Sequence, residues 1–171
     1  DIVDRFSHGE FYVKDSIKFN DSLRYETPKG RTVYGGGGIM PDRFVPYDST
    51  LNTDFYTELI DKRVIREFTL DYYLKNRASL ENLTLNQYVD DFRIGEIELK
   101  AIRNLAIELG VELNESEFSQ SVRHIKAHVK AEIARSVWDD IGFFKIYNAA
   151  SNRTFEQALT MFDDAQALAN R

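Results

Sequence analysis

The chain of 171 residues contains no cysteine. Disulfide bonds, thiolate zinc sites and cysteine nucleophiles are therefore excluded. Only three prolines and one tryptophan occur, and no apolar run approaches the roughly 20 residues that a membrane-spanning helix requires. Basic residues are in the minority, because 22 Lys and Arg face 28 Asp and Glu and leave a net charge of −6. Without a clustered basic stripe, nucleic acid is not an expected partner.

Bulky apolar residues, by contrast, are plentiful. Hydrophobic residues make up 43% of the chain, with 12 Phe and 9 Tyr among them. This content argues against disorder and is sufficient for a packed core. The length suits one domain or slightly more.

The most unusual stretch is residues 30–42, which read Gly-Arg-Thr-Val-Tyr-Gly-Gly-Gly-Gly-Ile-Met-Pro-Asp. Four consecutive glycines are incompatible with a helix interior and allow positive φ and close backbone approach. The stretch lacks the GxxxxGK[ST] pattern of a phosphate-binding loop. We interpret it as a hinge or a tightly packed crossing between an extended and a helical part of the chain.

Residues 1–48 are predicted to be extended or weakly β. Brief alternation of apolar and polar residues over 11–19 indicates strands or a hairpin, and residues 31–34 suit one more strand. Turn-forming residues cluster at 20–22 and 28–30. Isolated hairpins are only marginally stable in water, so this segment resembles the end of a larger sheet.

Residues 49–171 are predicted to be helical, because their apolar residues recur every three or four positions. The predicted fold class is thus mainly α, a bundle of about five helices that follows the extended segment. The expected helices run from Thr53 or Ser49 to about Lys75, from Thr84 through Phe92, from about Glu96 to Leu109, from Asn114 onward with a bend or end at Gly142, and from near Asn152. The helix at 96–109 is apolar around most of its circumference and is predicted to be central.

His124 and His128 are separated by four residues on the longest predicted helix, with Glu132 one turn further on. Two imidazoles and a carboxylate on one helical face form a candidate metal site for a metal-dependent hydrolase. The HExxH arrangement is absent, and Lys126 and Lys130 lie close by. A solvated face is therefore the preferred interpretation, and no metal or cofactor is predicted.

An aromatic cluster is expected near the end of this helix, formed by Trp138, Phe143, Phe144 and Tyr147. Core packing is its simplest explanation, while partial exposure would mark an interface with a partner domain or a second copy. This cluster supports one hypothesis for function, a self-standing helical protein-interaction module.

A second hypothesis comes from the glycine stretch, which resembles a segment of the carboxy-terminal processing peptidases, the tail-specific family of serine peptidases, in its Bacteroidetes form. The family segment reads Gly-Arg-x-(Ile/Val)-Tyr-Gly-Gly-Gly-Gly-Ile-x-Pro-Asp and lies near the end of the protease core. The matching residues are Gly30, Arg31, Val33, Tyr34, Gly35, Gly36, Gly37, Gly38, Ile39, Pro41 and Asp42.

The resemblance implies a parent enzyme with a Ser/Lys dyad and a PDZ domain, both upstream of this segment. Neither catalytic motif occurs in residues 1–171, so no catalytic residue is assigned and no peptidase activity is expected from this chain. We expect a piece of a longer protein, with residues 1–48 at the end of the protease core and 49–171 as a C-terminal helical domain. The helices would dock on the core, assemble an oligomer or restrict substrate access.

The resemblance also implies partners and a location. The expected partners are the protease core and PDZ domain of the same parent chain, its protein or peptide substrates, and a second copy of the chain. Family members are commonly exported, which implies a periplasmic or envelope-associated parent. Residues 1–171 contain no signal-peptide pattern, and we expect the targeting information of the parent to lie outside them.

Overall fold

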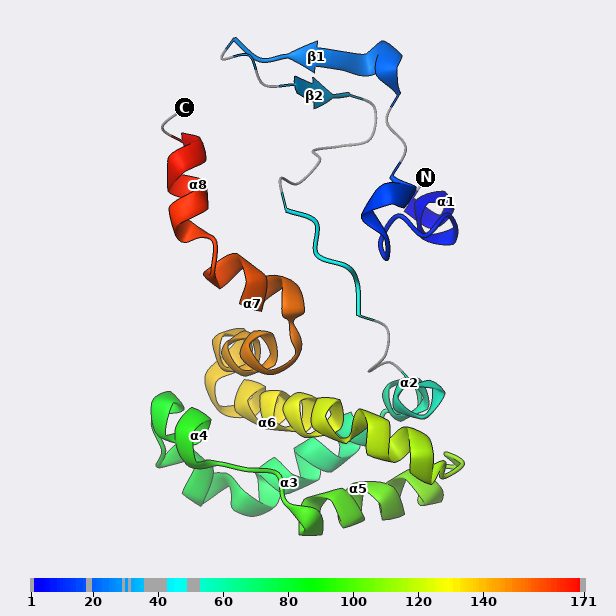
Figure 1. The fold of residues 1–171 in the computed structure, drawn as a ribbon. Helices are drawn as coiled ribbons and strands as arrows, with labels where there is room; N and C mark the ends of the chain where they lie inside the picture. Colours follow the sequence, from blue (N-terminus) through cyan, green and yellow to red (C-terminus); the bar gives the residue numbers. More distant parts are fainter. Residues whose placement is uncertain are drawn as a thin grey trace. The chain divides into compact units, whose positions relative to one another are not determined.

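The protein is mainly α, as its periodicity predicts (Figure 1). The computed structural model describes residues 2–17, 20–28, 30, 32–35, 43–48 and 53–169. These residues form eight α-helices, two short 3-10 helices and one antiparallel pair of strands. In chain order the elements are α1 (Ile2–Ser7), η1 (Lys14–Ser16), η2 (Asp21–Leu23), β1 (Arg24–Glu26), β2 (Thr32–Tyr34), α2 (Asp54–Asp61), α3 (Val64–Glu81), α4 (Leu85–Asp91), α5 (Glu96–Glu108), α6 (Glu115–Ser151), α7 (Arg153–Leu159) and α8 (Phe162–Ala169).

The chain divides into two compact units. The first, here called the N-terminal unit, comprises Asp1–Asp48 together with Gln157–Arg171. The second, the helical unit, comprises Ser49–Glu156. All buried hydrophobic side chains of the described residues lie between Phe55 and Ile146, so the core belongs to the helical unit.

In the N-terminal unit, β1 and β2 form a short hairpin with Tyr25 opposite Val33. Gly30 lies in the connection with a φ of 77°, a conformation that glycine adopts without steric cost. The strand predicted at residues 31–34 is therefore present as β2, and its partner is β1. The three-residue strands fit the prediction of weak β structure.

The strands predicted within residues 11–19 are wrong for the described part of that stretch, which contains turns and η1. The backbone N–H groups of Tyr12 and Val13 both donate to the carbonyl of Gly9, which has a φ of 76°. These bonds close a turn where an extended strand was expected. Local hydrogen bonds thus prevail over the short alternating pattern.

The helices α2, α4 and α6 begin at the predicted caps. The Thr53 side chain accepts from the Tyr56 N–H, and Thr84 forms a capping box with Gln87. Asn114 accepts from the first turn of α6. Each side chain satisfies N–H groups that have no intrahelical partner, and these starts were therefore predictable from the sequence.

The helix predicted from Thr53 to about Lys75 is instead two helices, α2 and α3. The break lies at Arg63, which has a φ of 60° in the left-handed region. The apolar stripe continues across the break, because Tyr56, Val64 and Phe68 are all buried. Periodicity alone therefore concealed the break.

The α6 helix reverses direction at Trp138 and Asp139, whose backbone angles are not helical. The first arm, residues 115–137, and the second arm, residues 140–151, lie against each other. Tyr147 on the second arm consequently hydrogen-bonds His124 on the first. The bend predicted at Gly142 is thus located a few residues earlier.

The first arm of α6 forms the centre of the core and packs on α2, α3 and α4. Its fully buried side chains include Ile125, Val129 and Ile133. The prediction that α5 is central was wrong, because α5 packs mainly on α3 and leaves Ile97 83% exposed. Apolar residues cover most of the circumference of α5, but only part of that circumference is buried.

Among the residues that the structure describes, no helix combines the length and apolarity needed to cross a bilayer. The same conclusion followed from the sequence. α6 is long enough, but polar and charged side chains interrupt it throughout.

Candidate functional site

The helical unit contains a cavity of about 490 Å³ where the end of α2 and the start of α3 meet the first arm of α6. This volume lies in the range of small-molecule sites in proteins. The cavity is here called the arginine pocket, and its lining residues are Leu59, Ile60, Arg63, Ile65, Arg66, His128, Glu132 and Arg135.

Two of the arginines come from the α2–α3 connection. Arg63 occupies the left-handed position between the helices, and Arg66 lies one turn further along α3. Both side chains are exposed, and neither has a hydrogen-bond or ion-pair partner in the described part of the chain. Among the described residues no side chain caps α3 by a hydrogen bond, and the acidic residue in its first turn is Glu67, which does not line the pocket.

The third arginine, Arg135, is positioned by contacts with three side chains. Its Nη1 lies 2.7 Å from Glu132 Oε1, and its Nε lies 3.1 Å from Asp140 Oδ1 across the α6 reversal. The guanidinium also stacks over the Phe143 ring at 3.7 Å from the centroid. These contacts fix one charged side of the pocket.

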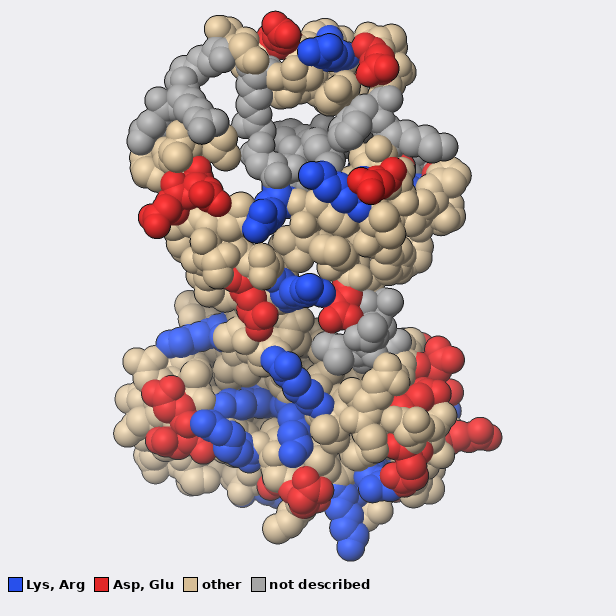
Figure 2. All heavy atoms as spheres, viewed as in Figure 1, with Lys and Arg blue, Asp and Glu red and all other residues tan. Residues whose placement is uncertain are grey.

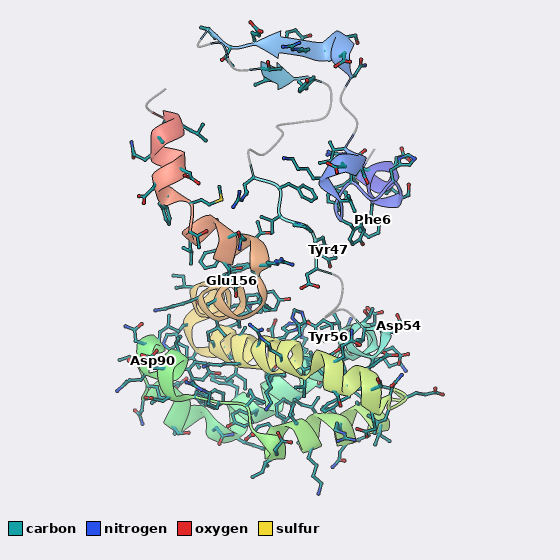
Figure 3. All side chains as sticks on the ribbon, viewed as in Figure 1. Phe6, Tyr47, Asp54, Tyr56, Asp90 and Glu156 are labelled. Carbon is teal, nitrogen blue, oxygen red and sulfur yellow. The ribbon has the colours of Figure 1, made fainter. Side chains whose placement is uncertain are left out.

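His128 and Glu132 continue this side toward α2. His128 Nδ1 lies 2.8 Å from the hydroxyl of Tyr56, which extends from α2 (Figure 3). His128 Nε2 lies 3.5 Å from Glu132 Oε1. The neighbouring His128 and Arg135 keep the pKa of Glu132 below its ordinary value, so this carboxylate stays ionised.

Behind the pocket, His124 is buried between the two arms of α6. Its Nε2 pairs with the Tyr147 hydroxyl at 3.2 Å, while its Nδ1 has no hydrogen-bond partner in the part of the chain that the structure describes. Burial and the proximity of His128 lower the pKa of His124. Burial likewise raises the pKa of the Tyr56 hydroxyl, which therefore remains protonated.

The predicted solvated face for His124, His128 and Glu132 is therefore wrong. The α6 reversal brings Tyr147 over the first arm, and α2 brings Tyr56 to it, so both imidazoles lie among aromatic rings. The row does not form a metal site, since no group of three or more His, Cys, Asp or Glu among the described residues is arranged to hold an ion.

The four aromatic residues predicted as a cluster differ in how deeply they are buried. Phe143 is buried and stacks on Tyr147, and Trp138 packs against Tyr88. Phe144 alone of the four is largely exposed, at 51%. Core packing thus accounts for three of them.

Four of the predicted motif residues lie among the described residues. Gly30 has positive φ, Val33 and Tyr34 pair with Tyr25 and Arg24 in the hairpin, and Gly35 donates its N–H to the carbonyl of Leu23. The remaining predicted positions fall outside the described residues, namely Arg31, Gly36, Gly37, Gly38, Ile39, Pro41 and Asp42.

A second hollow, of about 470 Å³, lies in the N-terminal unit. Its lining residues are Ile2, Val3, Phe6, Phe11 and Tyr47, two of which are labelled in Figure 3. Apart from the Tyr47 hydroxyl, this lining offers no polar side chain to orient a ligand. The arginine pocket is therefore the stronger candidate site.

Charge is unevenly distributed on the helical unit. Figure 2 shows Lys and Arg side chains gathered in the middle of the viewed face, with Asp and Glu side chains nearer its margins. The net charge of −6 therefore does not prevent locally positive surfaces. The residues of the arginine pocket provide another local excess of positive charge.

A mainly helical unit with a charged pocket is the class of structure that these observations define. A model of a family of unknown function, DUF8443, matches residues 55–139. No curated protein matches the chain, and no solved structure does. All residues that line the arginine pocket fall within the matched segment, which ends at the α6 reversal.

Proposed function

We propose that this chain is the non-catalytic C-terminal region of a serine processing peptidase that cleaves proteins near their C-termini. The observation that carries the proposal is the segment at residues 30–42, whose glycines, Tyr34 and Pro-Asp ending match the family motif. A compact helical unit follows this segment. That order agrees with a protease core followed by a helical extension.

In this proposal the helical unit provides support to the enzyme. Its core is continuous from Phe55 to Ile146, which makes it a body that docks as a whole. The unit would dock on the protease core, join copies of the enzyme or limit substrate access. The parent would be an exported, periplasmic or envelope-associated protein, and its PDZ domain and substrates would be further partners.

The experiment compares the purified chain with its upstream-extended parent in hydrolysis of a polypeptide substrate. We expect cleavage by the extended protein and none by residues 1–171 alone. Replacing the nucleophilic serine of the extended protein with alanine is the control and should abolish cleavage. A coding sequence without PDZ and Ser/Lys segments upstream would overturn the proposal.

The alternative is a self-standing helical interaction module. The observation in its favour is the second arm of α6, where Ile141 and Phe144 are 76% and 51% exposed. A second copy of the chain is the partner to test, by sedimentation equilibrium of the wild type and of an Ile141→Ser, Phe144→Ser double variant. Dissociation of a wild-type dimer by the double variant would support the module, and a monomeric wild type would exclude self-association.

A further inference from the structure

We propose that the arginine pocket binds a small organic monoanion, a carboxylate carried on an aliphatic group. This site is independent of the proposed peptidase relationship, because it depends only on the geometry of α2, α3 and α6. Three features of the pocket support the proposal: an excess of positive charge, two guanidinium groups that are unpaired among the described residues, and an apolar wall.

The charge excess follows from the lining residues. Arg63, Arg66 and Arg135 face one carboxylate, that of Glu132. Asp140 does not line the pocket but pairs with Arg135. When it is included, the pocket still has three positively charged groups and two negatively charged ones. An added monoanion would therefore reduce the net charge of the pocket. The ionised Glu132 would repel a second negative charge, which disfavours a dianion such as a phosphate monoester.

The two unpaired guanidinium groups supply the binding geometry. Arg63, in the left-handed position just before α3, and Arg66, in the first turn of α3, both line the cavity. A guanidinium offers a planar fork of N–H donors that matches the two oxygens of a carboxylate.

Arg135 adds directed donors from the opposite side of the pocket. Two of its N–H groups are engaged, at Nη1 with Glu132 and at Nε with Asp140. A guanidinium carries five donors, so others remain for a ligand. The contact with Phe143 restricts its rotation and lowers the entropic cost of binding.

The apolar wall specifies what the carboxylate is attached to. Leu59, Ile60 and Ile65 line the same cavity as the arginines. Leu59 and Ile65 are buried, and Ile60 is 39% exposed. Leu59 and Ile65 are already out of contact with water, so Ile60 provides the exposed apolar surface that an aliphatic chain on the anion would cover, a contribution to binding that inorganic phosphate lacks.

The test uses hexanoate as the probe in a ¹H–¹⁵N NMR titration of the full chain. We expect shifts of the backbone amides at residues 63–66 and of the Arg63 and Arg66 Nε–H signals. Hexanamide, which has the same aliphatic chain without the charge, should leave them unmoved. Inorganic phosphate is the second comparison and should bind more weakly than hexanoate.

Two variants assign the site. Arg63→Gly removes the guanidinium and retains a residue suited to positive φ, and Arg66→Gln retains helix propensity. Each should weaken hexanoate binding about tenfold, the effect of losing one charged hydrogen-bonding partner. Arg77→Ala, which removes an exposed arginine paired with Glu81 outside the pocket, is the matched control and should bind like the wild type.

Three results would overturn the proposal. Equal shifts with hexanamide would show that the pocket does not recognise charge. Stronger binding of phosphate than of hexanoate would show that the ligand is an inorganic anion and not an aliphatic carboxylate. Unchanged hexanoate affinity in both pocket variants would place the binding elsewhere. Thermal unfolding of each variant separates loss of binding from loss of fold.

Discussion

Gly142 lies where the two arms of α6 approach each other. A Cβ atom built there would be 2.8 Å from the carbonyl oxygen of Ala134 and 3.0 Å from the Cβ of Trp138. Both neighbours are close to the helical backbone and have little freedom to move. The absence of a side chain at this one position is therefore a condition for the reversal.

We expect Gly142→Ala to lower the free energy of unfolding by about 1–3 kcal/mol, because the added methyl group overpacks the contact between the arms. Urea denaturation followed by circular dichroism measures the change. Gly95→Ala is the control, since its Cβ would meet only the flexible end of the Glu98 side chain. A Gly142 variant as stable as the Gly95 variant would contradict the close approach.

The free energy of unfolding should depend on pH through His124. Its pKa is lowered by burial, so the unfolded chain takes up a proton that the folded chain rejects. The free energy of unfolding should therefore fall as the pH drops below about 6.5, the ordinary pKa of histidine, toward the lowered folded value.

Urea midpoints measured from pH 8 to pH 5 check this expectation. His124→Asn should flatten the dependence in this window. Glu132 contributes at lower pH, because its lowered pKa favours the folded state only while it is ionised. An unaltered slope in the His124 variant would contradict the assignment.

At the scale of elements, the α6 reversal depends on the backbone of Asp139. Its φ of 55° and ψ of −154° lie in a region that residues with a Cβ rarely occupy. The strain is compensated by the contacts that the reversal creates, such as the pairing of Tyr147 with His124. Removing the strain without removing the contacts should stabilise the fold.

We expect Asp139→Gly to raise the free energy of unfolding by about 1 kcal/mol, because glycine reaches this conformation without a Cβ clash. Asp139→Ala is the matched control, since it also removes the carboxylate but keeps the Cβ, and should give no gain. Chemical denaturation measures both. A gain in the alanine variant equal to that in the glycine variant would assign the effect to the lost charge.

The elements also show which parts of the helical unit were predictable. Helix starts at Thr53, Thr84 and Asn114 follow from side-chain caps, which act within a few residues. The break at Arg63 was missed, and the bend at Trp138–Asp139 was predicted at Gly142 instead, because neither position carries the Gly or Pro that usually marks a helix end. Their conformations result from packing between helices.

At the scale of the molecule, the buried hydrophobic side chains of the described residues all belong to the helical unit. The N-terminal unit has short elements and no buried hydrophobic residue in its described part. Since burial of apolar surface is the main source of stability, the two units should differ strongly in resistance to unfolding.

A polypeptide of residues 53–156 should therefore fold alone and unfold cooperatively, with a urea midpoint close to that of the full chain. Circular dichroism and hydrogen exchange check this expectation. In the full chain, the slowest-exchanging amides should lie in α3 and the first arm of α6. A truncated form that is unfolded or lacks a cooperative transition would show that the helical unit depends on the rest of the chain.

In the N-terminal part, α1, η1 and η2 replace much of the extended backbone that was expected for residues 1–48. The sequence alone was enough to predict the mainly α class, most helix starts and the strand at residues 32–34. These properties arise from periodicity, capping and glycine content, which act locally. Only the tertiary structure decided that α6 reverses, that His124 is buried beneath Tyr147 and that arginines from α3 and α6 line one pocket. Residues far apart in the chain make these contacts, and no local pattern records which distant side chain will be their partner.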